Sequence, residues 1–68
     1  MDGDFLRSFF RFLEEASPEE LRDRLEKLRS VRKQLREPRV RADSRFLARQ
    51  IDEELRARWE VRRLATSR

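Results

Sequence analysis

The fold is decided by a four-residue stretch, SPEE at residues 17–20, which predicts where one helix ends and the next begins. Ser17 suits the N-cap, where its hydroxyl accepts a backbone N–H, and Pro18 suits the first helical position. Glu20 follows three residues after the serine, so that its carboxylate can close a capping box. Because a residue before proline avoids the α region, the preceding helix should end near Glu15.

Upstream of this boundary, the periodicity predicts a short amphipathic helix over residues 4–15. Phe5, Phe9 and Phe10 lie on its apolar side. A helix of this length, about 18 Å, is not stable alone, so the aromatic side must pack against something. Two alternatives stay open: it packs on its own chain or on a twin subunit, or it grips a partner protein. The three phenylalanines are therefore candidate partner-binding residues.

Downstream of the boundary, a second helix is predicted over residues 18–36. Its leucines recur at heptad spacing and form a narrow seam of the coiled-coil type, which Arg32 interrupts. The seam consists of Leu21, Leu25, Leu28 and Leu35. Because so narrow a seam suits a single facing helix, these leucines and Arg32 are candidates for a core or a dimer interface.

The Glu37-Pro38 step ends the second helix, and a third helix is predicted over residues 43–65, with a tail at 66–68. The short connection favours an antiparallel helical hairpin. An apolar stripe runs along the third helix and supplies further candidates for the core or the dimer interface. The stripe consists of Leu47, Ile51, Leu55 and Trp59.

Two charged residues, Glu54 and Arg58, interrupt this stripe near its centre. A charged pair among apolar neighbours often fixes register or partner choice at some cost in stability. The alternative is a frayed helix end at which both charges reach water. We favour the first alternative and assign the pair, together with Arg32, to the interface.

Together these patterns predict an all-α protein in which residues 1–68 form a single small helical domain, a short amphipathic helix followed by a long antiparallel hairpin. A chain this short buries only about 60% of the surface of its unfolded form, so its core is marginal. It has no Cys and no His, so disulfides and the usual zinc ligands cannot add stability. Self-association remains, and we expect a homodimeric helical bundle or coiled coil.

The chain carries a net charge of +4, and the positive excess is local. Residues 29–49 hold eight of the eighteen Lys/Arg and only two acidic residues, whereas residues 1–28 hold five basic and eight acidic residues. The basic stretch is either a recognition surface or the solvated corner of the hairpin. Its candidate partner-binding residues are Arg29, Lys33, Arg36, Arg39 and Arg41.

No catalytic or metal-binding pattern is present in the sequence. Without Cys, His or Tyr, the commonest nucleophiles and neutral-pH bases are missing. Gly3 is the only glycine, so no glycine-rich loop can cradle a phosphate. The clustered carboxylates are adjacent in sequence and point in different directions on a helix, which is unlike a metal site. We therefore expect no enzyme, no cofactor and no small-molecule substrate.

The sequence predicts a helical regulator, inhibitor or adaptor that binds another protein, such as a transcription regulator or an acidic protein surface, as a homodimer. The alternative is a basic nucleic-acid-binding protein that uses residues 29–49 on phosphates, mostly without sequence specificity. Residues 1–4 are acidic where a signal peptide is basic, and no apolar run reaches the length of a membrane span. We therefore expect a cytoplasmic protein that does not bind membranes. No motif identifies a family.

Overall fold

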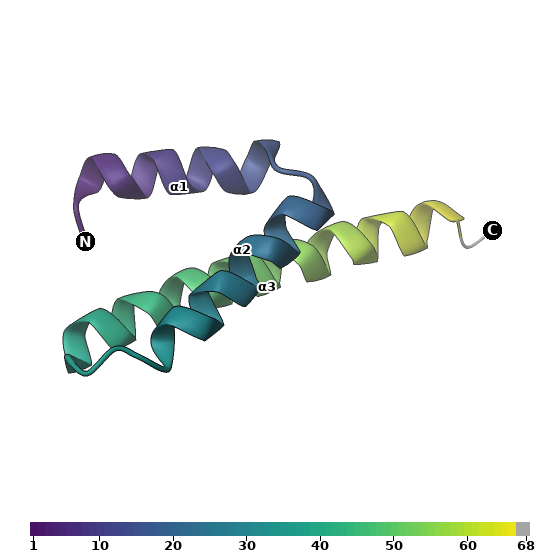
Figure 1. The fold of residues 1–68 in the computed structure, drawn as a ribbon. Helices are drawn as coiled ribbons and strands as arrows, with labels where there is room; N and C mark the ends of the chain where they lie inside the picture. The colour runs from purple at the N-terminus through teal and green to yellow at the C-terminus, as the bar shows by residue number, and fades with distance from the viewer. Residues whose placement is uncertain (67–68) are drawn as a thin grey trace.

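The computed structural model describes residues 1–66, which form three helices: α1 (Gly3–Glu15), α2 (Pro18–Arg32) and α3 (Pro38–Thr66). No strand occurs in this part of the chain, so the all-α prediction is confirmed. Figure 1 shows α2 and α3 side by side, running in opposite directions, with α1 lying along one side of this pair. Of the predicted tail, Thr66 belongs to α3 and the other two residues lie outside the described range.

The junction between α1 and α2 follows the predicted capping box. The Ser17 hydroxyl accepts the Glu20 N–H at 3.1 Å, and a Glu20 carboxylate oxygen accepts the Ser17 N–H at 3.1 Å. The backbone N–H of Ser17, and after it the side chain of Ser17, hold the pKa of the Glu20 carboxyl below its ordinary value of 4.5. The carboxylate therefore stabilises the fold above that value, and its contribution is lost as the pH falls through the lowered pKa.

The junction between α2 and α3 differs from the prediction. The second helix ends at Arg32 rather than Arg36, and the third begins at Pro38 rather than Asp43. After α2 the chain tightens, since Leu35 donates its N–H to the Arg32 carbonyl at 3.2 Å, three residues back. Pro38 then begins α3 instead of merely ending α2, because the first helical position needs no N–H donor. The Arg41 N–H closes the first turn on the Glu37 carbonyl at 3.0 Å.

The core is small and lies where the three helices meet. Its buried apolar side chains come from α1, α2, α3 and the first junction: Phe9, Leu13, Ala16, Leu21, Leu25, Leu47 and Ile51. Leu21 and Ile51 have no exposed surface. Phe12, Leu28, Ala48 and Leu55 pack around this cluster and are partly buried. Ser44, also buried, donates its hydroxyl to the Leu28 carbonyl at 3.4 Å.

Phe9 is a correction to the sequence prediction. It was assigned to a partner-binding surface, but its side chain is only 5% exposed and belongs to the core. Its ring packs with those of Phe5, at a centroid distance of 6.3 Å, and Phe10, at 5.9 Å. Phe5 and Phe10 remain exposed, so the aromatic side of α1 divides between the core and the surface. Periodicity alone places all three rings on one side and cannot decide which of them is covered.

We predict that shortening Ile51 destabilises the fold strongly. Ile51→Val should lower the free energy of unfolding by about 0.5–1.5 kcal/mol and Ile51→Ala by about 2–5 kcal/mol, because the site is fully enclosed. Val31→Ala on α2 is the control, since Val31 is 51% exposed, and should change it by less than about 0.5 kcal/mol. Urea denaturation followed by circular dichroism measures all three. Equal losses at the two positions would contradict the described core.

Candidate functional site

Arg58 on α3 joins this helix to the end of α1. Its Nη2 group donates to the carbonyl of Leu13 at 2.6 Å and to that of Glu14 at 3.4 Å, and its Nη1 group donates to the carbonyl of Ala16. The last carbonyls of a helix have no partner within the helix and carry the negative end of its dipole. Since the last turn of α1 contains no basic residue, Arg58 supplies the cation from α3.

Glu54 completes this arrangement, because its carboxylate accepts from Nε of Arg58 at 3.2 Å. The two side chains are 27% (Arg58) and 34% (Glu54) exposed, so the pair is partly shielded from water. The structure therefore brings together the two charged residues that the sequence placed in the apolar stripe, and sets them against α1 of the same chain. Arg32 does not join Glu54 and Arg58. Arg32 is the last residue of α2, whereas Arg58 contacts the junction at the other end of α2.

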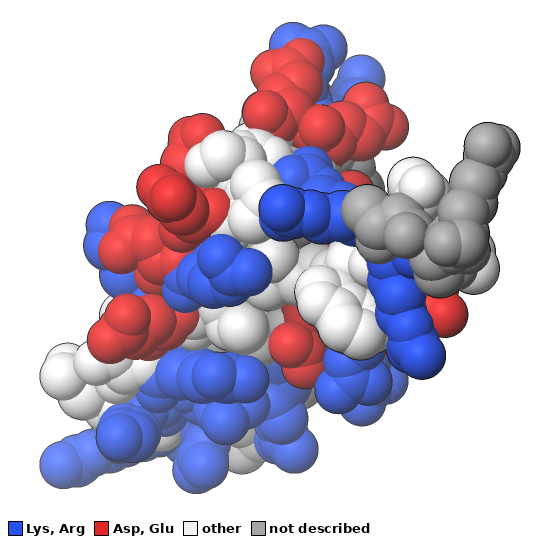
Figure 2. Space-filling view, turned by 90° about the vertical axis from the view of Figure 1, so that its right-hand side faces the viewer, with Lys and Arg blue, Asp and Glu red and all other residues white. Residues whose placement is uncertain are grey.

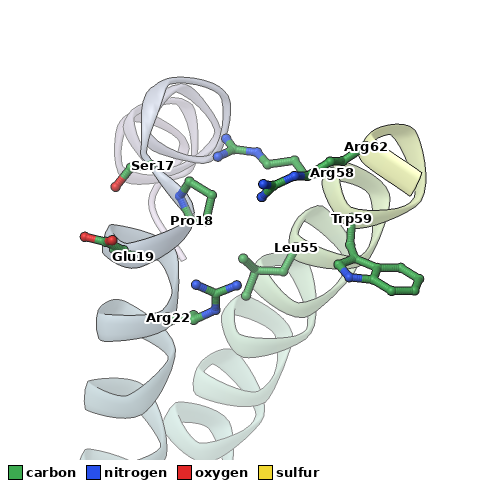
Figure 3. A pocket seen from close by; sticks show the side chains of 8 residues that line it. All are labelled: Ser17, Pro18, Glu19, Arg22, Leu55, Arg58, Trp59 and Arg62. Carbon is green, nitrogen blue, oxygen red and sulfur yellow. The ribbon is translucent and has the colours of Figure 1, made fainter. Parts of the chain in front are cut away.

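A pocket of about 410 Å³ lies beside Arg58, between the start of α2 and the last third of α3 (Figure 3). Its lining includes three arginines, one from α2 and two from α3, together with apolar and polar side chains. The lining residues are Ser17, Pro18, Glu19, Arg22, Leu55, Arg58, Trp59 and Arg62. In Figure 3 the Arg22 guanidinium faces Leu55, whereas Glu19 points to the other side of α2. We call this the arginine pocket.

The sequence pattern did not identify the arginine pocket. Neither Arg22 nor Arg62 is among the residues that the sequence pattern marks as candidates. The available signal was the four-residue spacing of Arg58 and Arg62, which puts both on one side of α3. That spacing does not reveal that the start of α2, with Arg22, lies opposite.

The last turns of α3, residues 59–66, carry exposed apolar side chains. We call this segment the α3 arm. Trp59 is 60% exposed, and Val61 and Leu64 are each 67% exposed. The guanidinium carbon of Arg63 lies 5.4 Å from the Trp59 ring centroid. Figure 1 shows this end of α3 extending beyond α1 and α2. Trp59, predicted to lie in a core or an interface, is therefore outside the core of this chain.

Most other candidates for a core or an interface lie in the core of the chain itself. Leu21, Leu25, Leu47 and Ile51 are buried, and Leu28, Leu35 and Leu55 are half-buried. Leu21, Leu25 and Leu28 of the predicted seam thus pack in the core, whereas Leu35 lies beyond the end of α2.

The five basic candidates for partner binding are all exposed: Arg29, Lys33, Arg36, Arg39 and Arg41. They do not lie on a single helix, because Lys33 and Arg36 lie in the connection between α2 and α3. Figure 2 shows Lys and Arg side chains gathered along the lower part of the molecule, where this connection lies in Figure 1. Phe5 and Phe10 lie on α1 and not in this connection.

We predict that Arg58→Ala loosens α1. The change removes the charged donor from three backbone carbonyls, and hydrogen bonds to charged groups each contribute about 1.5–3 kcal/mol, so unfolding should become easier by at least that amount. Hydrogen exchange of the α1 amides should accelerate. Arg56→Ala is the matched control, because Arg56 is 82% exposed and lies 3.8 Å from Asp52. If the two variants lost equal protection in α1, Arg58 would not anchor that helix.

Two further observations concern residues 1–66. No helix in this range has both the length and the apolar character needed to cross a membrane, and no cluster of three or more acidic side chains is placed to hold a metal ion. Comparison of the chain with protein-family models, with curated proteins and with solved structures finds no match.

Proposed function

We propose that this chain is a small non-enzymatic helical protein that binds another protein, as a regulator, inhibitor or adaptor, and that it works as a homodimer. The observation that carries this proposal is the α3 arm, with Trp59, Val61 and Leu64 exposed. Absence of His, Cys and Tyr from the sequence supports a binding role over a catalytic one.

The lengths of the helices explain why the arm is uncovered. At about 1.5 Å per residue, the 29 residues of α3 span about 43 Å, whereas the 15 residues of α2 span about 22 Å. The excess length of α3 cannot be covered by α2. Short helical segments owe most of their stability to packing of an apolar side, so an arm with three large exposed apolar residues is typical of an interface. Tryptophan beside arginine is also a frequent combination at the energetic centre of interfaces.

In the proposed dimer, α2 and α3 of each copy form an antiparallel hairpin, and two hairpins associate as a helical bundle. The small core of each copy supports this arrangement, because it leaves large apolar residues at the surface, including Phe10 on α1 and Leu64 on α3. Burial of such surface contributes about 25 cal/mol per Å², so association stabilises a chain that has little core of its own.

We predict that the protein is a dimer by multi-angle light scattering at about 100 μM, a concentration far above a Kd near 1 μM. The double variant Val61→Ser/Leu64→Ser should be monomeric with unchanged helix content, because both side chains lie outside the core. Val31→Ser, which removes a 51%-exposed apolar side chain from α2, is the control and should remain dimeric. A monomeric wild-type protein would rule out the proposed dimer.

A second candidate function, nucleic-acid binding, is favoured by one observation, the basic end at the α2–α3 connection. Arg36, Arg39 and Arg41 are exposed and have no ion pair among residues 1–66. Against this function, the outer side of α3 carries Asp52 and Glu53, which repel a phosphate backbone.

We predict that duplex DNA, followed by fluorescence anisotropy, binds only at low salt. Each phosphate contact contributes a slope of about −0.9 to the dependence of log K on log salt, so nonspecific binding should vanish between about 50 and 200 mM salt. The triple variant Arg36→Ala/Arg39→Ala/Arg41→Ala should abolish the low-salt signal. Binding that persists at 200 mM and is lost in this variant would favour the nucleic-acid function over the protein-binding one.

A further inference from the structure

We infer that the arginine pocket binds a carboxylate from an acidic segment of a partner protein, and that the apolar side chains of the pocket receive an aliphatic residue next to that carboxylate. The chemistry of the partner follows from the residues of this pocket, and the inference rests on the proposed protein-binding function. The pocket is separate from the basic connection between α2 and α3, where the sequence pattern predicts partner recognition.

Positive charge in the pocket comes from two helices. Arg22 enters from α2, and Arg58 and Arg62 enter from α3 (Figure 3). The one acidic residue in the lining, Glu19, has its carboxylate on the other side of α2 in the same view. The lining therefore holds three guanidinium groups against the single carboxylate of Glu19, and this positive excess favours an anionic ligand.

The arginines have different parts in this site. Arg58 has its guanidinium committed to Glu54 and to the end of α1, so it adds charge and fixes the wall of the pocket. Arg22 is exposed and makes no hydrogen bond or ion pair among residues 1–66, so its planar fork is available for a ligand. Arg62 faces the same space from one turn further along α3 than Arg58. Arg22 can therefore bind a carboxylate directly, while Arg62 adds positive charge from the opposite helix.

The remaining lining is apolar, which favours a peptide over a free ion. Leu55, half-buried, lies opposite Arg22, and Pro18 and Trp59 form further parts of the lining. A carboxylate on the guanidinium groups thus places a neighbouring aliphatic side chain against carbon atoms, and its burial adds to affinity.

The surroundings of the pocket argue against a nucleic acid as its ligand. The end of α1 and the start of α2 carry exposed acidic residues: Glu14, Glu15, Glu19, Glu20 and Asp23. Figure 2 shows Asp and Glu side chains gathered on the left and at the top of this face, apart from the basic lower end. A continuous polyanion would meet these carboxylates, whereas a single carboxylate flanked by apolar residues fits between them.

The test uses a hexapeptide of alternating glutamate and leucine, acetylated and amidated at its ends, with the glutamine–leucine peptide as the uncharged control. Trp59 is the only tryptophan and lines the pocket, so its fluorescence reports binding, which calorimetry then quantifies. We expect the glutamate peptide to bind at least about tenfold more tightly than the glutamine peptide, as one lost charge-assisted hydrogen bond implies. Arg22→Gln and Arg62→Gln should each weaken binding about tenfold or more.

Arg29→Gln is the matched control, because Arg29 is an exposed arginine on α2 outside the pocket, and it should bind as the wild type does. Equal affinity for the two peptides, or equal affinity of the Arg22 and Arg29 variants, would overturn the site. Inorganic phosphate displacing the peptide more effectively than acetate at equal concentration would assign the pocket to phosphate and also overturn it. If light scattering shows the dimer while the peptide fails to bind, the pocket assignment is wrong and the proposed function stands.

Discussion

The guanidinium group of Arg58 is the contact on which the placement of α1 depends. It bridges residues more than forty positions apart in the chain, from α3 to the carbonyls of Leu13 and Ala16. The end of α1 has neither a glycine cap nor a cation of its own, so these carbonyls depend on α3 for a charged donor. Because α1 supplies Phe9 and Leu13 to a core of seven side chains, holding this helix in place also holds much of the core together.

The same contact shapes the proposed binding site. Arg58 separates the end of α1 from the arginine pocket, so a residue that stabilises the fold also forms one wall of the pocket. A cation whose position is already fixed loses little conformational freedom when a ligand arrives, which favours affinity. Arg22 lies one turn after the capped start of α2, and the capping box keeps that turn in place. Two local devices, a cap and an anchored arginine, therefore pre-organise opposite sides of one pocket.

The fold could be predicted from the sequence where local chemistry determines it. The SPEE stretch correctly places the end of α1 at Glu15 and the start of α2 at Pro18, because capping depends on residues within one turn. At the second junction the same approach fails, since Pro38 is compatible with both ending one helix and beginning another. The contacts of Arg58 could be predicted in part. Spacing pairs Arg58 with Glu54, but no side-chain pattern shows that backbone carbonyls of α1 are its other partners. For the same reason the arginine pocket, which needs the placement of α2 against α3, was missed.

The connections between the helices have a kinetic consequence. Only Ala16 and Ser17 separate α1 from α2, and only residues 33–37 separate α2 from α3. Loops this short cost little entropy to close, and each helix meets its neighbour without a long search. Helical proteins dominated by such local contacts fold in microseconds to milliseconds. The α2–α3 pair can therefore form early, whereas the Phe-rich α1 is held only when α3 brings Arg58 to it, so an open chain exposes α1 to aggregation for longer than the other helices.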